Sequence, residues 1–510
     1  MLKFIHRKTF NTTTITNKLP FSSSSISPER TLRPSSEKDA EVLFSRMGNR
    51  DGSVITNENI LQVHNIDWTK KYKGNASILC RPKTVEEVSS ILSYCNEEKI
   101  GVVPQAGNTG VVGGGIPMDK EIILSVQDLD QIEAFDEVNG ILTCGSGCIL
   151  QKLQESVSEW NHLVPIDLGA KGSCMIGGNI STNAGGSYYF RFGSIHANII
   201  GLEVVLPNGT ILDLMNLNRK DNTGYDLKHL FIGSEGTLGV VTKIALSCPR
   251  LPLAKNAAFL ACDDFKGVEE TLSLAKQELG EILGAFEFMD SDVLDIVAEE
   301  IKIPVTKSHS SSDKSDIPDN YRFCLLVETL GANDAHDKEK INQFLEKCMD
   351  NNYVVDGILA QDLKQVQEMW HIREGCNPII KAKGYNYKYD LSLPIPQFYD
   401  IIEETRRRLS SRPDAICVNW GHVIDGNIHI NVITPGKFEE DEEIKALLEP
   451  IIFESVVRRS GSISAEHGLG QQKNKYLGVY AKNQEALSIM KSMKELFDPN
   501  GIMNPGKYLP

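Results

Sequence analysis

Two histidines on either side of a turn are the residues of this chain whose types and spacing best suit metal chemistry. His422 and His429 flank Asp425-Gly426, a dipeptide that favours a two-residue hairpin turn between short apolar runs. In that register His422 lies opposite His429 with Cβ atoms about 5 Å apart, and Asn431 falls on the same face. Two imidazoles so placed can bind one metal ion. A three-residue turn would shift the pairing and weaken this prediction.

An acid and an imidazole that stand together later in the chain add to this group. Glu466 and His467 occur in the sequence Ser-Ala-Glu-His-Gly. This segment, with its carboxylate and imidazole, can supply a third metal ligand. Opposed histidines occur more often without a metal than with one, so an incidental cluster stays open as an alternative.

Arg373 and Lys388 are candidates for binding the carboxylate groups of a substrate. Arg offers two parallel N–H donors and Lys a point charge, although each also occurs as an ordinary surface cation. The chain carries a formal net charge of −15, which disfavours nucleic acid and anionic membrane surfaces as partners. An anionic substrate therefore needs a local basic cluster.

Two glycine-rich stretches are suited to hold a large polar cofactor. Residues 168–186 interleave Gly with Ser, Thr and Asn, and residues 104–115 follow an apolar run that predicts a strand at 100–103. Main-chain N–H groups of such loops bind phosphate. Neither is a Walker loop or a Rossmann fingerprint, because Leu150 replaces the third glycine after Gly145-Ser146-Gly147. Two such loops favour a flavin, although a ligand-free turn stays open for 168–186 alone.

Hydrophobic periodicity predicts the elements that must position these residues. Short strands at 78–80 and 100–103 enclose a helix that begins at a capping box of Thr84 and Glu87, and a strand and helix follow again at 141–157, which indicates repeated βαβ units. Further predictions are a hairpin at 199–214, a loop at 231–239 before a strand at 240–247, strands at 258–262, 285–288 and 323–328, a surface loop at 307–319 and a helix at 484–497.

The N-terminus and the cysteines bear on the compartment. Residues 1–28 are basic, rich in Ser and Thr, and free of acid until Glu29, which predicts a mitochondrial presequence, with a disordered basic tail as the alternative. Eleven cysteines without C-x-x-C pairs suit a reducing compartment, and Cys144 and Cys148 are interpreted as core thiols. No apolar run reaches about 18 residues, so no membrane span is expected.

Residues 104–115, 168–186, 220–227, 231–239, 421–431 and 464–468 together resemble the vanillyl-alcohol oxidase-type FAD proteins, in the D-lactate and D-2-hydroxyglutarate dehydrogenase branch. The resemblance runs from about residue 77 to residue 510. It implies an α+β fold with an FAD-binding domain (77–252), a substrate and metal domain on an antiparallel sheet (253–470), and a C-terminal helix and tail (471–510) that returns to the flavin. The presequence (1–36) and an N-terminal extension (37–76) complete the expected division.

The same resemblance implies FAD-dependent oxidation of D-2-hydroxyglutarate to 2-oxoglutarate, with hydride transfer to flavin N5 and zinc lowering the hydroxyl pKa. It makes His422, His429 and Glu466 the zinc ligands and His467 the catalytic base. The substrate-binding residues that it implies are Arg373, Asn377, Lys388, Asn431 and His467. The cofactor-binding residues that it implies are Pro104, Gln105, Ala106, Gly107, Asn108, Thr109, Gly110, Gly172, Ser173, Gly177, Gly178, Asn179, Thr182, Asn183, Ala184, Gly185, Gly186, Gly236 and Asn504.

Three further expectations follow from the resemblance. Many relatives attach FAD through a histidine in the first loop, where this chain has Ala106 and Gly107, so non-covalent FAD is expected. An electron-transfer flavoprotein in the mitochondrial matrix is the expected electron acceptor. Asn377 departs from the hydroxyl residue of close relatives, which leaves the chain length of the hydroxy acid open.

Three other functions remain as alternatives. D-lactate dehydrogenase is the first. An alkyl-glycerone-phosphate synthase-like transferase shares the fold, but the terminal Tyr508-Leu509-Pro510 is no peroxisomal signal and the N-terminus suggests mitochondria. An electron-transfer subunit without a substrate of its own would have no use for the histidines and the acid.

Overall fold

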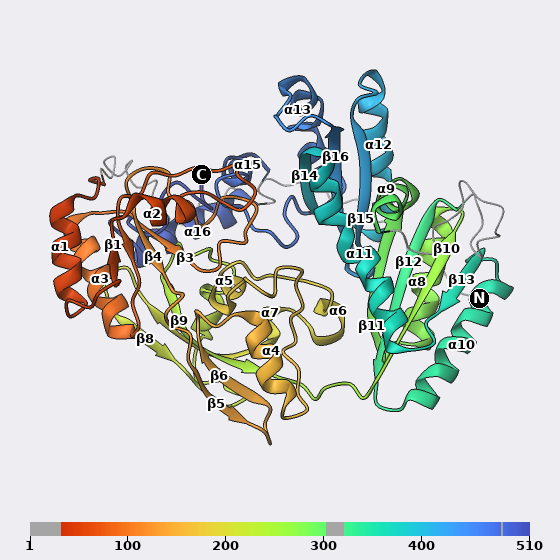
Figure 1. The fold of residues 1–510 in the computed structure, drawn as a ribbon, viewed down its shortest axis with the longest axis horizontal. Coiled ribbons are helices and arrows are strands. Elements are labelled where there is room, and N and C mark those ends of the chain that lie inside the picture. The colour runs from red at the N-terminus through yellow and green to blue at the C-terminus, as the bar shows by residue number, and fades with distance from the viewer. Residues whose placement is uncertain (1–31, 302–320, 481–482) are drawn as a thin grey trace, which may run out of the picture.

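The computed structural model describes residues 32–301, 321–480 and 483–510. Most of the predicted presequence and the predicted loop at 307–319 lie outside the described residues. The chain folds into two groups of sheets with the C-terminal segment lying over the first group (Figure 1).

A small four-stranded sheet opens the fold, with strand order β1 (Val54–Ile55), β2 (Leu79–Cys80), β4 (Ile122–Ser125) and β3 (Val102–Gln105). Helices α1 (Glu37–Arg46), α2 (Glu58–His64) and α3 (Val85–Glu98) belong to this part. The hydroxyl of Thr84 caps α3 by accepting from Glu87 N, as predicted, while the Glu87 carboxylate accepts from Lys83 N rather than completing the capping box. The predicted βαβ unit is present with one change: β4 lies between β2 and β3, parallel to both.

A five-stranded antiparallel sheet follows, with order β5 (Ile132–Asp136), β6 (Ile141–Gly145), β9 (Val240–Ser247), β7 (Ile199–Val205) and β8 (Ile211–Leu214). The second predicted βαβ unit is wrong, because β6 pairs antiparallel with β5 and β9 instead of joining the first sheet. Short buried strands have the same apolar pattern in parallel and antiparallel sheets, so periodicity could not tell which kind of sheet β6 joins. The helical elements of this part are α4 (Leu150–Ser158), α5 (Ile176–Ser181), α6 (Tyr189–Phe192), α7 (Ile195–Asn198) and η1 (Leu227–Leu230).

A seven-stranded antiparallel sheet forms the second group, with order β13 (Asp356–Leu359), β10 (Ala254–Cys262), β12 (Phe323–Gly331), β11 (Leu283–Asp290), β15 (Ile416–His422), β16 (Asn427–Pro435) and β14 (Gly384–Ser392). One face packs on α8 (Phe265–Glu278), α10 (Asp334–Asp350), α12 (Asp400–Arg408), α13 (Glu442–Leu448) and α14 (Ile451–Arg458). The other face packs on α9 (Ser291–Ile301) and α11 (Leu363–Lys383).

The C-terminal segment returns from the second sheet group to the first. After α15 (Asn474–Tyr480) and α16 (Gln484–Phe497), Ile502 accepts a hydrogen bond from Val102 N at 2.8 Å, and Asn504 N donates to the Val102 carbonyl oxygen at 2.8 Å. The tail therefore lies beside β3 like an added strand, and Figure 1 places α16 and the C-terminus in the same part of the fold as β3. The helix predicted at 484–497 is confirmed with the same ends.

The cysteines of the described chain are all buried and free, including Cys144 and Cys148, as predicted for core thiols. None of the described helices combines the length and the apolar character that crossing a bilayer requires.

Candidate active site

Three loops of the first sheet group surround one cavity. Residues 104–110 and 112–115 form one wall, residues 174–182 another and residues 235–241 a third, and His467 closes one end. The first and second loops can approach closely because Gly107 lacks a side chain: an added Cβ would lie 2.2 Å from the Ser173 carbonyl oxygen. At Gly110 an added Cβ would meet no protein atom within 4 Å, so the space before this main chain is open to a ligand.

This cavity fits a flavin nucleotide. Its wall is rich in Gly, Asn and Thr and offers main-chain N–H groups and neutral side-chain donors, which suit a pyrophosphate. Asn504 lies behind the wall, where its amide donates to the carbonyl oxygens of Gly114 at 3.0 Å and Glu235 at 2.7 Å. Asn504 therefore fixes the first and third loops relative to each other.

The end of the second loop reaches out of the cradle to the acid predicted as a metal ligand. Gly186 N donates to Glu466 Oε1 at 2.8 Å, and an added Cβ at Gly185 would lie 2.5 Å from the same oxygen. The cofactor loop and the candidate metal site therefore share one carboxylate.

The hairpin that carries the two histidines has a different register from the predicted one. His422 pairs with Asn427 and Trp420 pairs with His429, so His422 does not lie directly opposite His429. The connection holds four residues, because Val423–Asp425 form a 3-10 turn and Gly426 adopts a left-handed conformation with φ 79°. Side chains alternate with a period of two, so this shift by two residues leaves both histidines on one face.

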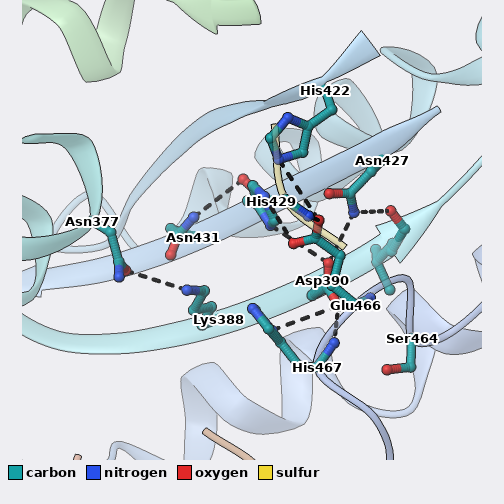
Figure 2. A network of polar contacts seen from close by, with 12 residues as sticks. Asn377, Lys388, Asp390, His422, Asn427, His429, Asn431, Ser464, Glu466 and His467 are labelled. Carbon is teal, nitrogen blue, oxygen red and sulfur yellow. Dashed lines mark hydrogen bonds and ion pairs between the residues drawn. The ribbon is translucent and has the colours of Figure 1, made fainter. Parts of the chain in front are cut away.

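His422, His429 and Glu466 converge on that face (Figure 2). Their ligand atoms all lie within 4.8 Å of one another, with His422 Nε2 3.8 Å from Glu466 Oε1 and His429 Nε2 4.0 Å from Glu466 Oε2. Two imidazoles and one carboxylate are a ligand set of the kind that binds zinc. Asp390, Glu466 and His467 form an overlapping group of the same kind.

The other nitrogen of each imidazole faces a buried carboxylate. His422 Nδ1 lies 2.6 Å from Glu287 Oε1, and His429 Nδ1 lies 3.5 Å from Asp390 Oδ1. Such partners fix the ring and direct Nε2 towards a metal. Burial alone would lower the pKa of His422, but the Glu287 carboxylate raises that pKa to about 9. A metal ion must therefore displace a proton from this ring.

His467 is placed to accept a proton. Its Nδ1 lies 3.5 Å from Asp390 Oδ2, its ring stacks at 6.0 Å on that of His429, and its side chain keeps 23% exposure. Burial among protein atoms, helped by the charges of Lys388 and Lys473, lowers the pKa of His467 to about 4. The ring is neutral at physiological pH, which is the form that a general base requires.

Among the predicted substrate-binding residues, Lys388 and Asn377 contact each other, whereas Arg373 contacts a buried carboxylate. Lys388 Nζ donates to Asn377 Oδ1 at 3.2 Å. Asn431 follows His429 on β16 and lies beside Lys388 in the β14–β16 ladder. Arg373 is one helical turn from Asn377 on α11, but its Nε lies 2.7 Å from Glu287 Oε2. One carboxylate thus holds both Arg373 and His422.

Sequence reasoning gave no role to Glu287 or Asp390, which organise the cluster. Glu287 is 1% exposed and stands between Phe286 and Phe288, so a charge inside an apolar strand was the available signal. Asp390 alternates with Lys388 on β14, accepts from Glu466 N and His467 N at 2.8 and 3.0 Å, and accepts from Asn427 Nδ2 at 2.8 Å.

Comparison with known proteins shows which family the chain is similar to. Residues 76–215 match the FAD binding domain family, and residues 251–508 match the family of FAD linked oxidases, C-terminal domain. The mitochondrial D-2-hydroxyglutarate dehydrogenase of Danio rerio is 46% identical over 461 residues, which cover 90% of this chain and 83% of that protein. A putative mitochondrial D-lactate dehydrogenase of Schizosaccharomyces pombe is 42% identical over 490 residues, covering 93% of this chain and 90% of that protein.

The fold is also found among solved structures. An alkyldihydroxyacetonephosphate synthase superposes with a TM-score of 0.69 at 14% identity, over 92% of this chain and 85% of that protein. That likeness concerns the fold, which is the α+β arrangement of the vanillyl-alcohol oxidase-type proteins with an antiparallel second sheet. With both family matches and relatives of this identity over most of its length, the chain belongs to the FAD-linked oxidase family, in the D-2-hydroxyacid dehydrogenase branch.

Proposed function

We propose that this chain oxidises D-2-hydroxyglutarate to 2-oxoglutarate with FAD. The observation that carries the proposal is the position of Glu466, which accepts from Gly186 of the cofactor loop and faces His422 and His429. A substrate carbon placed there would lie between the flavin cradle, metal-type donors and a neutral imidazole. The name of the Danio rerio relative supports the substrate.

Each group at the site has a distinct task. The residues of the three loops would hold and orient FAD, whose flavin would supply the hydride acceptor for the substrate Cα. His422, His429 and Glu466 would hold zinc, which would supply Lewis-acid stabilisation of the ionised hydroxyl. His467 accepts the hydroxyl proton, while Asp390 orients its ring through Nδ1 and through the main-chain N–H of His467.

Arg373, Lys388, Asn377 and Asn431 bind the carboxylates. A second carboxylate paired with a cation contributes about 1.5–3 kcal/mol, or tenfold to hundredfold in preference over a substrate with a methyl group there. D-lactate is the second candidate substrate, supported by the name of the fission yeast relative and by Asn377, which replaces a hydroxyl residue expected from the family.

Rates measured on a panel of D-2-hydroxy acids test the proposal. D-2-hydroxyglutarate should give the highest kcat/KM, and Arg373→Met should lower kcat/KM for it at least tenfold more than for D-lactate. Equal losses on both substrates would mean that Arg373 holds either the carboxylate that both substrates share or the side chain of Glu287. The assignment of a diacid substrate would then lose its basis.

The FAD is non-covalent in this proposal, because Ala106 and Gly107 stand where a histidine would form the bond. Acid precipitation should release all flavin into the supernatant, and flavin retained in the pellet would contradict it. The electron acceptor is an electron-transfer flavoprotein in the mitochondrial matrix, a proposal supported by the mitochondrial names of the relatives and the basic N-terminus. Reduction of purified electron-transfer flavoprotein by the substrate-reduced enzyme tests it.

A further inference from the structure

A cavity of about 910 Å³ adjoins the candidate active site, and its lining carries more lysines than carboxylates. Asn377, Lys388, Asp390 and His467 line its inner end, and residues 68–72 of the N-terminal extension line its outer end. The charged lining groups are Lys70, Lys71, Lys381, Lys388, Lys445, Lys473 and Lys475 against Asp390, Glu440 and Glu449. Among the described residues, seven lysines against three carboxylates make the lining positive, in a chain whose formal net charge is −15.

Much of this positive charge is not neutralised by ion pairs. Lys445 pairs with Glu440 at 2.5 Å. By contrast, in the described parts of the chain no carboxylate lies within ion-pair distance of Lys71, Lys381 or Lys473. Lys473 Nζ donates to the Ile463 carbonyl oxygen at 2.9 Å. Neutral partners hold an ammonium group in place without cancelling its charge. Lys473 is 2% exposed, whereas Lys71 is exposed and Lys381 half-buried, so the ammonium groups of Lys71 and Lys381 are the ones within reach of an anion.

Lys71 and Lys381 are held by a reciprocal pair of contacts across the outer end. Lys71 Nζ, from the N-terminal extension, lies 4.7 Å from the centroid of the Tyr385 ring and donates to the Asn386 carbonyl oxygen at 2.9 Å. Lys381 Nζ, from α11, lies 3.6 Å from the centroid of the Trp68 ring and donates to the Trp68 carbonyl oxygen at 3.3 Å. Each segment supplies one lysine and one aromatic ring.

The N-terminal extension is also attached on the cofactor side. His64 Nδ1 lies 2.5 Å from Gln105 Oε1, and Asn108 Nδ2 donates to the Ile66 carbonyl oxygen at 2.9 Å. The segment therefore runs from the first flavin loop to the edge strand β14. Its contacts on both sides give Lys71 a defined position at the outer end of the cavity.

We propose that Lys71 and Lys381 form an outer binding site for dicarboxylate anions, from which the substrate passes inward to Lys388 and His467. This inference rests on the proposed function in that it takes the oxidised substrate to be a dicarboxylate. A positively charged cleft raises the local concentration of anions and their association rate. A dianion is attracted more strongly than a monoanion, so selection for diacids begins before the substrate reaches the catalytic residues.

The first test is the double variant Lys71→Met and Lys381→Met in the full chain loaded with FAD. At low salt its KM for D-2-hydroxyglutarate should rise about tenfold while kcat changes less than about twofold. KM for D-lactate should change by less than about threefold, and added salt should reduce the difference from the unmodified protein because salt screens exposed charges. Lys364→Met is the matched control, since Lys364 lies on the same helix, is 82% exposed and does not line the cavity.

A second double variant, Lys71→Arg with Lys381→Arg, separates charge from packing. Arg keeps the positive charge and the contact with an aromatic ring, so KM for D-2-hydroxyglutarate should stay within about threefold of the unmodified value. An Arg variant as impaired as the Met variant would overturn the proposal, as would a Met variant with unchanged KM or with equal losses on both acids.

Binding of glutarate, which has no hydroxyl to oxidise, tests the site independently of the reaction. Isothermal titration should show glutarate binding weakened about tenfold by the Met double variant and unaffected by Lys364→Met. That result would support the outer site even if another hydroxy acid proved to be the oxidised substrate, in which case only the proposed function would fail. Equal glutarate affinity in the Met double variant and the unmodified protein would overturn the outer site.

Discussion

The flavin cradle and the substrate site of this chain are built in different ways. The cradle is made of main chain from three loops, each contiguous in sequence, and its close approaches depend on the absence of side chains at positions such as Gly107. The substrate site is made of side chains from α11, β11, β14, β15, β16 and residues 464–468, which meet through strand order. Glu466 and Gly186 join the two. Added bulk is therefore expected to damage the cradle. The substrate site is expected to be damaged by the loss of a charge or of a ligand atom, even when the side chain keeps its size.

The largest effect is expected from adding one methyl group to the cradle. In Gly107→Ala the new Cβ would lie 2.2 Å from the Ser173 carbonyl oxygen, so the first and second loops would have to separate. FAD content, measured from flavin absorbance per protein, should fall close to zero, and substrate oxidation should fall with it. Gly169→Ala is the control, because its added Cβ meets nothing within 4 Å. Normal flavin content in Gly107→Ala would remove the steric basis of the comparison.

The next effect is expected from removing a candidate metal ligand. His429→Ala should lower kcat by about a thousandfold while FAD stays bound, because Lewis-acid stabilisation supplies several kcal/mol and the histidine does not line the cradle. Metal analysis of the purified variant should show zinc lost. His196→Ala, which removes a histidine outside the cluster, should keep both zinc and rate. Full zinc content with a normal rate in His429→Ala would refute the assigned site.

A smaller effect is expected from Glu287, which touches neither the cradle nor the metal position. Glu287→Gln keeps the shape but removes the charge that faces His422 Nδ1 and Arg373 Nε, so zinc affinity or kcat/KM should fall about tenfold to hundredfold. Glu328→Gln changes a neighbouring buried glutamate that pairs with Lys255 and Trp370. Its melting temperature should fall without a specific loss of zinc. Equal behaviour of the two variants would make Glu287 a structural residue only.

The smallest effect is a pH dependence of the substrate site that the cradle does not share. Burial lowers the pKa of Lys388 to about 8, against the opposing charges of Asp390 and Glu466. The ammonium form is therefore present below pH 8 and is lost as pH rises through that value. For D-2-hydroxyglutarate kcat/KM should fall up to about tenfold above pH 8, while flavin content stays constant. In Lys388→Met, kcat/KM should no longer fall above pH 8. A fall that persisted in this variant would mean that another group titrates there.

The sequence alone determined the features that depend on local order. Glycine spacing predicted loops that line one cavity, proposed to hold the flavin, Thr84 predicted the start of α3, and the ends of α16 were predicted correctly, because caps, glycine and apolar periodicity act within a few residues. His422, His429, Glu466 and His467 were also grouped from their types, and two of them shared a short hairpin.

Only the tertiary structure decided the features that depend on pairing between distant segments. The hairpin register was wrong by two residues because a 3-10 turn at Val423–Asp425 lengthened the connection, and the period of two in strands kept the histidines together nonetheless. The antiparallel place of β6, the carboxylates of Glu287 and Asp390 beside the histidines, and the position of Lys71 opposite Tyr385 all follow from sheet order and packing. Strand neighbours that are far apart in sequence are selected by the whole core, and no local pattern encodes that choice.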